Sequence, residues 1–244
     1  MGANTFSGQS NGQSGVVKRI FQSLLQVILL ALILAALIFI PAGSDHLDWG
    51  MAWILLGVYS TGLFVTFLLL NVCDPDLARE RAKIQEGTKS WDVKLINLFN
   101  SLIYLVMPPL AGVDKRLGWS PPVSLAVQWM ALIVFVLGLG LFDWAMLSNR
   151  FFSGTVRIQE DRGHTVVNDG PYRVVRHPGY VGMILMFVSP PLVLGSLWAL
   201  IPAGLAALAT VVRTALEDKT LQVELPGYKE YAQQTRYRLL PGIW

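Results

Sequence analysis

The chain has 244 residues, of which 53% are hydrophobic and only 14% are charged, and its net charge is +3. So apolar a composition excludes an ordinary soluble domain and predicts a membrane protein. The single cysteine, Cys73, excludes an internal disulfide bond. The basic residues form no stripe interleaved with aromatic side chains, so we expect no nucleic-acid partner.

The chain begins with 19 residues rich in Gly, Ser and Asn, which we expect to form a disordered cytosolic tail. After this tail, apolar windows of about 20 residues predict about six membrane-spanning helices. These helices cover residues 20–42, 49–71, 95–112, 123–147, 179–195 and 197–216. Pro190 and Pro191 interrupt the fifth helix and should kink or break it. The predicted fold class is therefore an all-α polytopic membrane protein.

Three regions follow from this pattern. They are the tail (1–19), the first four membrane helices (20–148) and a C-terminal region with helices five and six (149–244).

All lysines and arginines except Lys115 and Arg116 fall on one side of the predicted membrane. By the positive-inside rule, both chain ends then face the cytosol. We expect a prokaryotic inner membrane, or the endoplasmic reticulum if the organism is eukaryotic.

The usual soluble cofactor and metal motifs are absent from the sequence. The glycine-rich stretch "LGLGLFD" lies inside an apolar helix with no strand before it, so it predicts helix packing and not nucleotide binding. There is no Walker loop, HExxH, GxSxG or CxxC motif, and three histidines with one cysteine predict no metal site. We therefore expect no Rossmann-type domain.

The connection before the fifth helix reads "TVRIQEDRGHTVVNDGPYRVVRHP". Its Val and Ile residues alternate on either side of "EDRG", which predicts a short β-hairpin, and "NDGP" predicts a turn. The region is too regular in pattern to be a simple linker.

The stretch "RHPGY" closes this connection. Pro178 suits the first turn of a helix, so His177 should lie at the cap of the fifth helix. Beside the first-turn amides, Arg176 and His177 would form an anion site. Gly179 would permit close approach of a ligand, and Tyr180 offers an aromatic face. The alternative is that Arg176 contacts lipid headgroups and His177 only caps the helix.

The end of the sixth helix carries a second group of charges. Arg213 and Glu217 are four residues apart, so they share one helical face. An ionisable pair at membrane depth is expensive and usually faces a cavity. The alternative is that Arg213 extends to the interface in a simple ion pair. Asp143 is a further buried charge, with no evident partner in the sequence.

These motifs together resemble the isoprenylcysteine carboxyl methyltransferase family and its phospholipid methyltransferase relatives. The resemblance rests on "HTVVNDGPYRVVRHPGYVG", then Arg-x-x-x-Glu-Asp-x-x-Leu, "GYKEY" and the closing "RLLPGIW", and covers roughly residues 150–244. It implies an integral-membrane methyltransferase that uses S-adenosylmethionine in a cytosolic-face pocket, formed by a C-terminal catalytic region over residues 149–244. Asp218 stands where the family more commonly has Glu.

The resemblance also implies roles for individual residues. The cofactor-binding positions would be Gln159, His164, Thr165, Val166, Val167, Tyr172, His177, Pro178, Gly179, Tyr180 and Glu217. Gln159 fits less well, because its spacing to His164 is shorter than in the family. Arg213 would face the substrate, and Arg213 and Glu217 would be the catalytic residues.

The expected partners are membrane lipids and a lipophilic or lipid-modified methyl acceptor, which could be a carboxylate, a thiol or an amine. Two other functions stay open at this point. One is an NADPH-dependent membrane oxidoreductase similar to sterol reductases, and the other is a non-enzymatic transport or assembly protein. The sequence does not indicate an oligomeric state.

Overall fold

The computed structural model describes residues 7–244, with side-chain surroundings from Arg19 onward. Helices make up the regular structure of these residues, and no strand occurs among them, which confirms the predicted all-α membrane class. The first six residues of the predicted tail lie outside the described part. The first helix begins at Ser7 and not at residue 20 as predicted, although its membrane-compatible stretch begins at Arg19.

The helices in chain order are α1 (Ser7–Ala42), α2 (Gly50–Cys73), α3 (Pro75–Arg81), α4 (Ser90–Asn100), α5 (Met107–Leu117), α6 (Leu125–Leu147), α7 (Pro178–Val193), α8 (Leu200–Glu224) and α9 (Tyr228–Gln234). A π-helical segment, Ser101–Val106, joins α4 to α5, so that these form one long rod. Five helical stretches of the described chain are long and apolar enough to cross a membrane: Arg19–Ala42, α2, Ser90–Leu117, α6 and α8.

The predicted fifth span is the exception to the six-span prediction. The helix α7 has 16 residues, which is shorter than the other five. Pro190 and Pro191 lie inside its last turn, and the helix ends at Val193. Because proline cannot donate the backbone hydrogen bond that continues a helix, an end so soon after the two prolines is expected.

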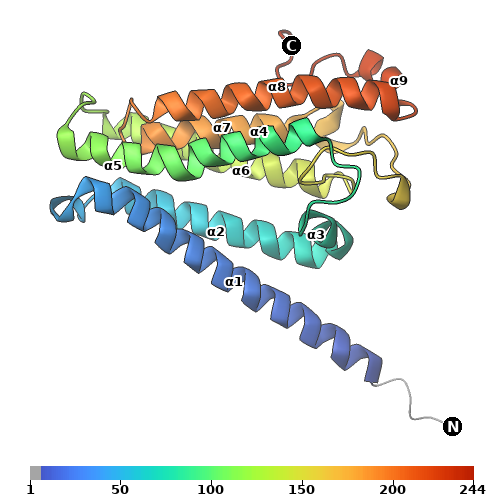
Figure 1. The fold of residues 1–244 in the computed structure, drawn as a ribbon, viewed down its shortest axis with the longest axis horizontal. Helices are drawn as coiled ribbons and strands as arrows, with labels where there is room; N and C mark the ends of the chain where they lie inside the picture. Colours follow the sequence, from blue (N-terminus) through green and yellow to red (C-terminus); the bar gives the residue numbers. More distant parts are fainter. Residues whose placement is uncertain (1–6) are drawn as a thin grey trace.

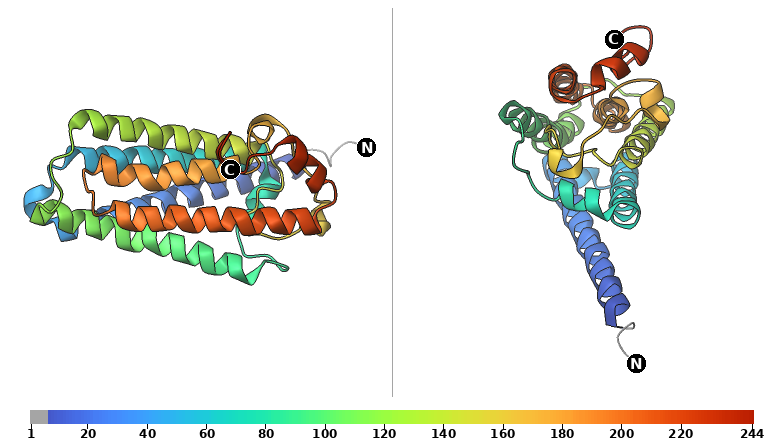
Figure 2. Two further views of the ribbon diagram at one scale, coloured as in Figure 1. Left: turned by 90° about the horizontal axis from the view of Figure 1, so that it is seen from above. Right: turned by 90° about the vertical axis from the view of Figure 1, so that its right-hand side faces the viewer.

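The long helices lie side by side in a bundle (Figure 1). α7 lies between α6 and α8 and also touches α2, as an end-on view shows (Figure 2). α1 packs on α5 and α2 through its C-terminal part, whereas its N-terminal end projects away from the other helices (Figures 1 and 2). α3, α9 and the connection between α6 and α7 gather at one end of the bundle (Figure 1).

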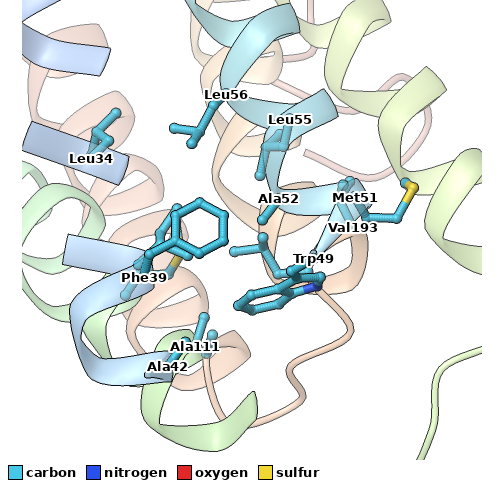
Figure 3. Packing of buried hydrophobic residues seen from close by; sticks show 14 of the residues in the cluster. Leu34, Phe39, Ala42, Trp49, Met51, Ala52, Leu55, Leu56, Ala111 and Val193 are labelled. Carbon is cyan, nitrogen blue, oxygen red and sulfur yellow. The ribbon is translucent and has the colours of Figure 1, made fainter. Parts of the chain in front are cut away.

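An apolar cluster at the opposite end joins α1, α2, α5 and α7. Phe39 of α1 stacks on Trp53 of α2, with ring centroids 4.5 Å apart, and meets Trp49 edge-on at 6.3 Å. Ala111 and Val193, both without exposed surface, complete the contact (Figure 3). Lipid tails are as apolar as these side chains, so close packing, and not removal from water, holds this cluster together.

α6 and α7 approach each other closely at two glycines. A Cβ atom placed on Gly182 would lie 2.6 Å from the carbonyl oxygen of Gly138, and one on Gly138 would lie 2.9 Å from that of Gly182. Small residues allow helix backbones to approach in this way. The packing role predicted for "LGLGLFD" is thereby confirmed at Gly138, whereas Gly140 has open space beside it.

The connection between α6 and α7 does not form the predicted β-hairpin. It is irregular, with two short 3-10 turns at Glu160–Arg162 and Gly170–Arg173. At Val156 the backbone pairs with a distant part of the chain: its N–H donates to the Asp92 carboxylate, and its carbonyl accepts from the Lys89 N–H. Long-range partners therefore take the backbone hydrogen bonds of Val156 that a hairpin would have used.

Candidate cofactor and substrate cavity

A cavity of about 470 Å³ lies between α2, α4, α6, α7, α8 and the α6–α7 connection, with Arg81 of α3 at its wall. Its size is typical of pockets for small molecules and cofactors. Of the residues singled out in the sequence, those that line it are Gln159, His164, Thr165, Val166, Val167, Tyr172, Arg176, His177, Gly179, Tyr180, Arg213 and Glu217. Pro178 is buried at the start of α7 and does not line the cavity.

Tyr180 of α7 lies at the centre of this group. Its hydroxyl donates to the carboxylate of Glu217 in α8, and its ring stacks nearly parallel to the His177 ring, with centroids 5.7 Å apart. The guanidinium carbon of Arg213 lies 5.0 Å from the centre of the Tyr180 ring. Two turns of α8 and the first turn of α7 therefore present a carboxylate, two aromatic rings and a cation to one space.

Arg213 does not pair with Glu217 as the sequence suggested. Its partner is Asp92 of α4, which accepts from Arg213 Nε at 2.5 Å and from Nη2 at 3.0 Å. Nη2 also donates to the Gly154 carbonyl at 3.1 Å. Asp92 is fully buried and Arg213 is 4% exposed, so Arg213 is a buried ion-paired residue and does not extend to the protein surface. A contact between residues 121 positions apart leaves no local signal in the sequence.

Arg176 is also committed to an internal partner. Its Nε and Nη2 donate to the Asp218 carboxylate at 2.7 and 3.1 Å, and its Nη1 donates to the carbonyls of Thr235 and Arg236. With only 6% of its surface exposed, it cannot contact lipid headgroups. Both sequence interpretations of Arg176, as an anion site and as a lipid contact, are therefore wrong, because the protein supplies the anion itself.

His177 belongs to the same group around Asp218. Its Nε2 lies 3.4 Å from the Asp218 carboxylate and 3.4 Å from the hydroxyl of Tyr228. It stands at the N-cap position of α7 as predicted, but its ring makes no capping hydrogen bond. The ring instead presents a face to Tyr180, so the interpretation of His177 as a simple helix cap is wrong.

The α6–α7 connection contributes Gln159 and His164. The Gln159 side chain is 1% exposed, donates to the Phe151 carbonyl at 2.8 Å and accepts from Arg162, so little of its amide is free for a ligand. The His164 ring lies on the Phe151 ring at 4.6 Å. Burial, together with the positive charges of Arg157 and Arg162, lowers the pKa of His164 to about 4, so the ring is neutral at pH 7.

Tyr172 is buried against the end of α6. Its hydroxyl lies 3.3 Å from both the Asn149 amide and the Ala145 carbonyl, and its own carbonyl accepts from the Tyr231 hydroxyl at 2.7 Å. Burial raises the pKa of the Tyr172 phenol above its ordinary value. Tyr172 therefore stays protonated and shapes the wall of the cavity.

Comparison with known protein families bears on this site directly. Residues 130–223 match the model of the isoprenylcysteine carboxyl methyltransferase (ICMT) family. The resemblance found in the sequence is thereby confirmed. No curated protein matches the chain. The family region runs from α6 through the connection and α7 almost to the end of α8, and thus includes every site position predicted above.

Several residues outside the family region line the same cavity and were not foreseen. They are Tyr59, Leu63, Thr66, Phe67, Leu70, Arg81, Ile96, Phe99, Asn100 and Tyr104 from the first half of the chain, and Leu225, Tyr228 and Tyr231 after α8. The cavity is therefore not formed by the C-terminal region alone, as the sequence suggested. An apolar or aromatic residue in a membrane helix is so common that its type carried no signal of a site.

Two of these residues form a polar contact deep in the bundle. The hydroxyl groups of Tyr59 in α2 and Tyr104 lie 3.1 Å apart. Tyr104 belongs to the π-helical segment Ser101–Val106, a distortion that is frequent at functional sites. Both tyrosines also line a second, smaller cavity of about 100 Å³, so they stand where the two cavities adjoin.

Asp143, which had no evident partner in the sequence, accepts a hydrogen bond from the Thr66 hydroxyl at 2.8 Å.

Within the part of the chain that the structure describes, no group of three or more His, Cys, Asp or Glu side chains is placed to hold a metal ion.

Proposed function

We propose that this protein transfers a methyl group from S-adenosylmethionine to a lipophilic acceptor at the cytosolic side of its membrane. The family match supports a membrane methyltransferase. The observation that supports S-adenosylmethionine as the methyl donor is the cavity of about 470 Å³. Glu217, Tyr180 and His164, from separate segments of the family region, all line it. The cytosolic placement follows from the charge distribution.

The cavity residues fit the chemistry of S-adenosylmethionine. Glu217 accepts from only one protein group among the described residues, the Tyr180 hydroxyl, so its carboxylate retains acceptor sites for an ammonium or a ribose hydroxyl. The rings of His177 and Tyr180, which stack on each other, both line the cavity and would be aromatic neighbours of a bound cation. Half-buried Val166 and Val167 offer apolar surface to a base. When bound, the cofactor would supply the electrophilic methyl group.

The protein's own contribution would be alignment and exclusion of water. Methyl transfer is an in-line displacement, so a carboxylate or thiolate acceptor requires no general base. Asp92 holds Arg213 through Nε and Nη2. Nη1 has no hydrogen-bond partner among the described residues, so Arg213 could orient an acceptor oxygen with this third nitrogen.

The second cavity supports an acceptor with an apolar tail. It is lined almost entirely by apolar side chains from α1, α2, α5, α6 and α7. It shares Tyr59, Tyr104, Met186 and Phe187 with the larger cavity. A ligand with its polar head beside Arg213 could therefore extend its tail past the tyrosine pair into the bundle.

Calorimetry on the detergent-solubilised full chain tests this proposal. We expect saturable binding of S-adenosylmethionine and S-adenosylhomocysteine, and no binding of NADPH. Glu217→Gln should weaken binding of both adenosyl ligands about 10- to 100-fold, because a charge-assisted hydrogen bond is lost. Glu224→Gln is the matched control, since Glu224 lies on the same helix but pairs with Lys89 at the surface.

The same titration separates the competing functions. Saturable binding of NADPH alone would favour a membrane oxidoreductase similar to sterol reductases. Well-folded protein that binds neither kind of cofactor would favour a non-enzymatic transport or assembly role. Either result would contradict the proposed methyl transfer.

A further inference from the structure

Arg81 is the last residue of α3 and lies outside the family region, yet its side chain lines the large cavity. Its Nη1 donates to the Phe152 carbonyl at 2.8 Å. Its guanidinium carbon lies 5.3 Å from the centre of the Phe152 ring and 5.9 Å from that of Phe142. One hydrogen bond and two aromatic rings therefore hold the guanidinium at the cavity wall.

The other arginines of the cavity wall all have carboxylate partners. Arg157 pairs with Glu80 at 2.9 Å, Arg176 with Asp218 at 2.7 Å, and Arg213 with Asp92 at 2.5 Å. Arg81 makes no ion pair with any residue that the structure describes. The cavity therefore contains one cation whose charge the described part of the protein does not balance.

Asp143 of α6 is near enough to attract Arg81 but makes no ion pair with it, and accepts instead from Thr66. Burial, together with the positive charge of Arg213, lowers the pKa of Arg81 to about 10, so it remains charged at neutral pH. A half-buried charge without an ion-pair partner is unfavourable, and an anionic ligand would relieve that cost.

We propose that Arg81 binds the carboxylate of a ligand in this cavity. The inference rests on the proposed methyl transfer. Since only Nη1 bonds to a described residue, Nε and Nη2 remain along one edge of the guanidinium, which matches the two oxygens of a carboxylate. That carboxylate belongs either to the amino-acid part of the adenosyl cofactor or to the methyl acceptor.

The first arm of the test addresses the cofactor. S-adenosylhomocysteine carries the carboxylate, and 5′-methylthioadenosine lacks it. If the cofactor is the source, Arg81→Gln should weaken binding of S-adenosylhomocysteine about 10- to 100-fold and leave methylthioadenosine unchanged. Arg81→Lys should be intermediate. Arg79→Gln is the matched control, because Arg79 lies on the same helix but is exposed and pairs with Asp76.

The second arm addresses the acceptor, with N-acetyl-S-dodecylcysteine and its carboxamide as lipid-tailed probes. If the acceptor is the source, the wild-type protein should prefer the acid to the amide, and Arg81→Gln should lose this preference while it retains S-adenosylhomocysteine binding. Thermal unfolding of each variant verifies that it is folded. Should Arg81→Gln not fold, Arg81→Lys is compared with the wild type in the same two arms.

The inference is overturned if the variants bind both carboxylate ligands as the wild type does. It is also overturned if they weaken ligands with and without a carboxylate equally, since that result indicates a structural role. Failure of the wild type to bind any adenosyl ligand would instead contradict the proposed function, and the acid–amide comparison would then decide the role of Arg81 alone.

Discussion

Two fully buried aspartates, Asp92 and Asp218, each hold an arginine at the same end of the bundle, but their surroundings differ. The donors around Asp218 are Arg176, His177, Gln222, Tyr228 and Arg238. Among the described residues, Asp92 receives only Arg213 and the Val156 backbone N–H. Both groups border the cavity, through Arg176, His177 and Tyr228 in one case and Arg213 in the other, but Asp218 has more protein donors than Asp92 among the described residues.

The difference teaches that the number of donors around a buried carboxylate separates a structural group from one that can serve a ligand. Asp218 joins the start of α7, the end of α8 and the C-terminal segment. The backbone N–H groups of Arg176 and His177 also donate to carbonyls of that segment. Asp92 leaves one nitrogen of Arg213 without a partner among the described residues. We therefore expect stability to depend mainly on Asp218 and turnover mainly on Arg213.

The largest expected effect is that of Asp218→Asn. The substitution keeps the shape of the side chain but leaves Arg176 as a buried charge without a counter-ion, so we expect a loss of about 3–5 kcal/mol in the free energy of unfolding. Denaturant unfolding in detergent measures it. Asp169→Asn, which removes an exposed partner of Arg173, should cost less than about 1 kcal/mol. Equal losses in the two variants would contradict a structural role for the Asp218 group.

Arg213→Lys should have a smaller effect on stability and a specific effect on turnover. Lysine keeps the charge but cannot reproduce the two-nitrogen contact with Asp92, so we expect a loss of about 1–3 kcal/mol in stability. Transfer of labelled methyl from S-adenosylmethionine into lipid-soluble product should fall more than cofactor affinity does. Normal turnover in this variant would contradict the role of Arg213 towards the acceptor.

The smallest expected effect is a pH dependence of stability that is due to His164, a residue of the cavity wall. Its pKa is about 4 in the folded chain, against an ordinary value of 6.5, so the unfolded chain binds more protons between these values. Stability should therefore fall as the pH is lowered from about 6.5 to about 4, and His164 should add no slope above that range. The unfolding midpoint of His164→Gln, followed over the same pH range, should lack this part of the slope. Identical profiles would contradict the assignment.

The sequence predicted the membrane helices well, because a span requires only a local run of apolar residues. Its errors came where distant groups decide the structure. The α6–α7 connection has the alternating Val and Ile residues of a hairpin, but the backbone groups of Val156 bond to Asp92 and Lys89. Arg176 had the position of an anion site, but Asp218 occupied it.

By itself, then, the sequence determined the all-α membrane class, the family resemblance and part of the residues that line one cavity, since motifs and apolar runs are local properties. Only the tertiary structure decided which carboxylate balances which arginine. Ion pairs such as Asp92–Arg213 join residues 121 positions apart, and burial makes their pairing obligatory. For the same reason, only the tertiary structure singled out Arg81. Unlike the other arginines of the cavity wall, it has no carboxylate partner among the described residues.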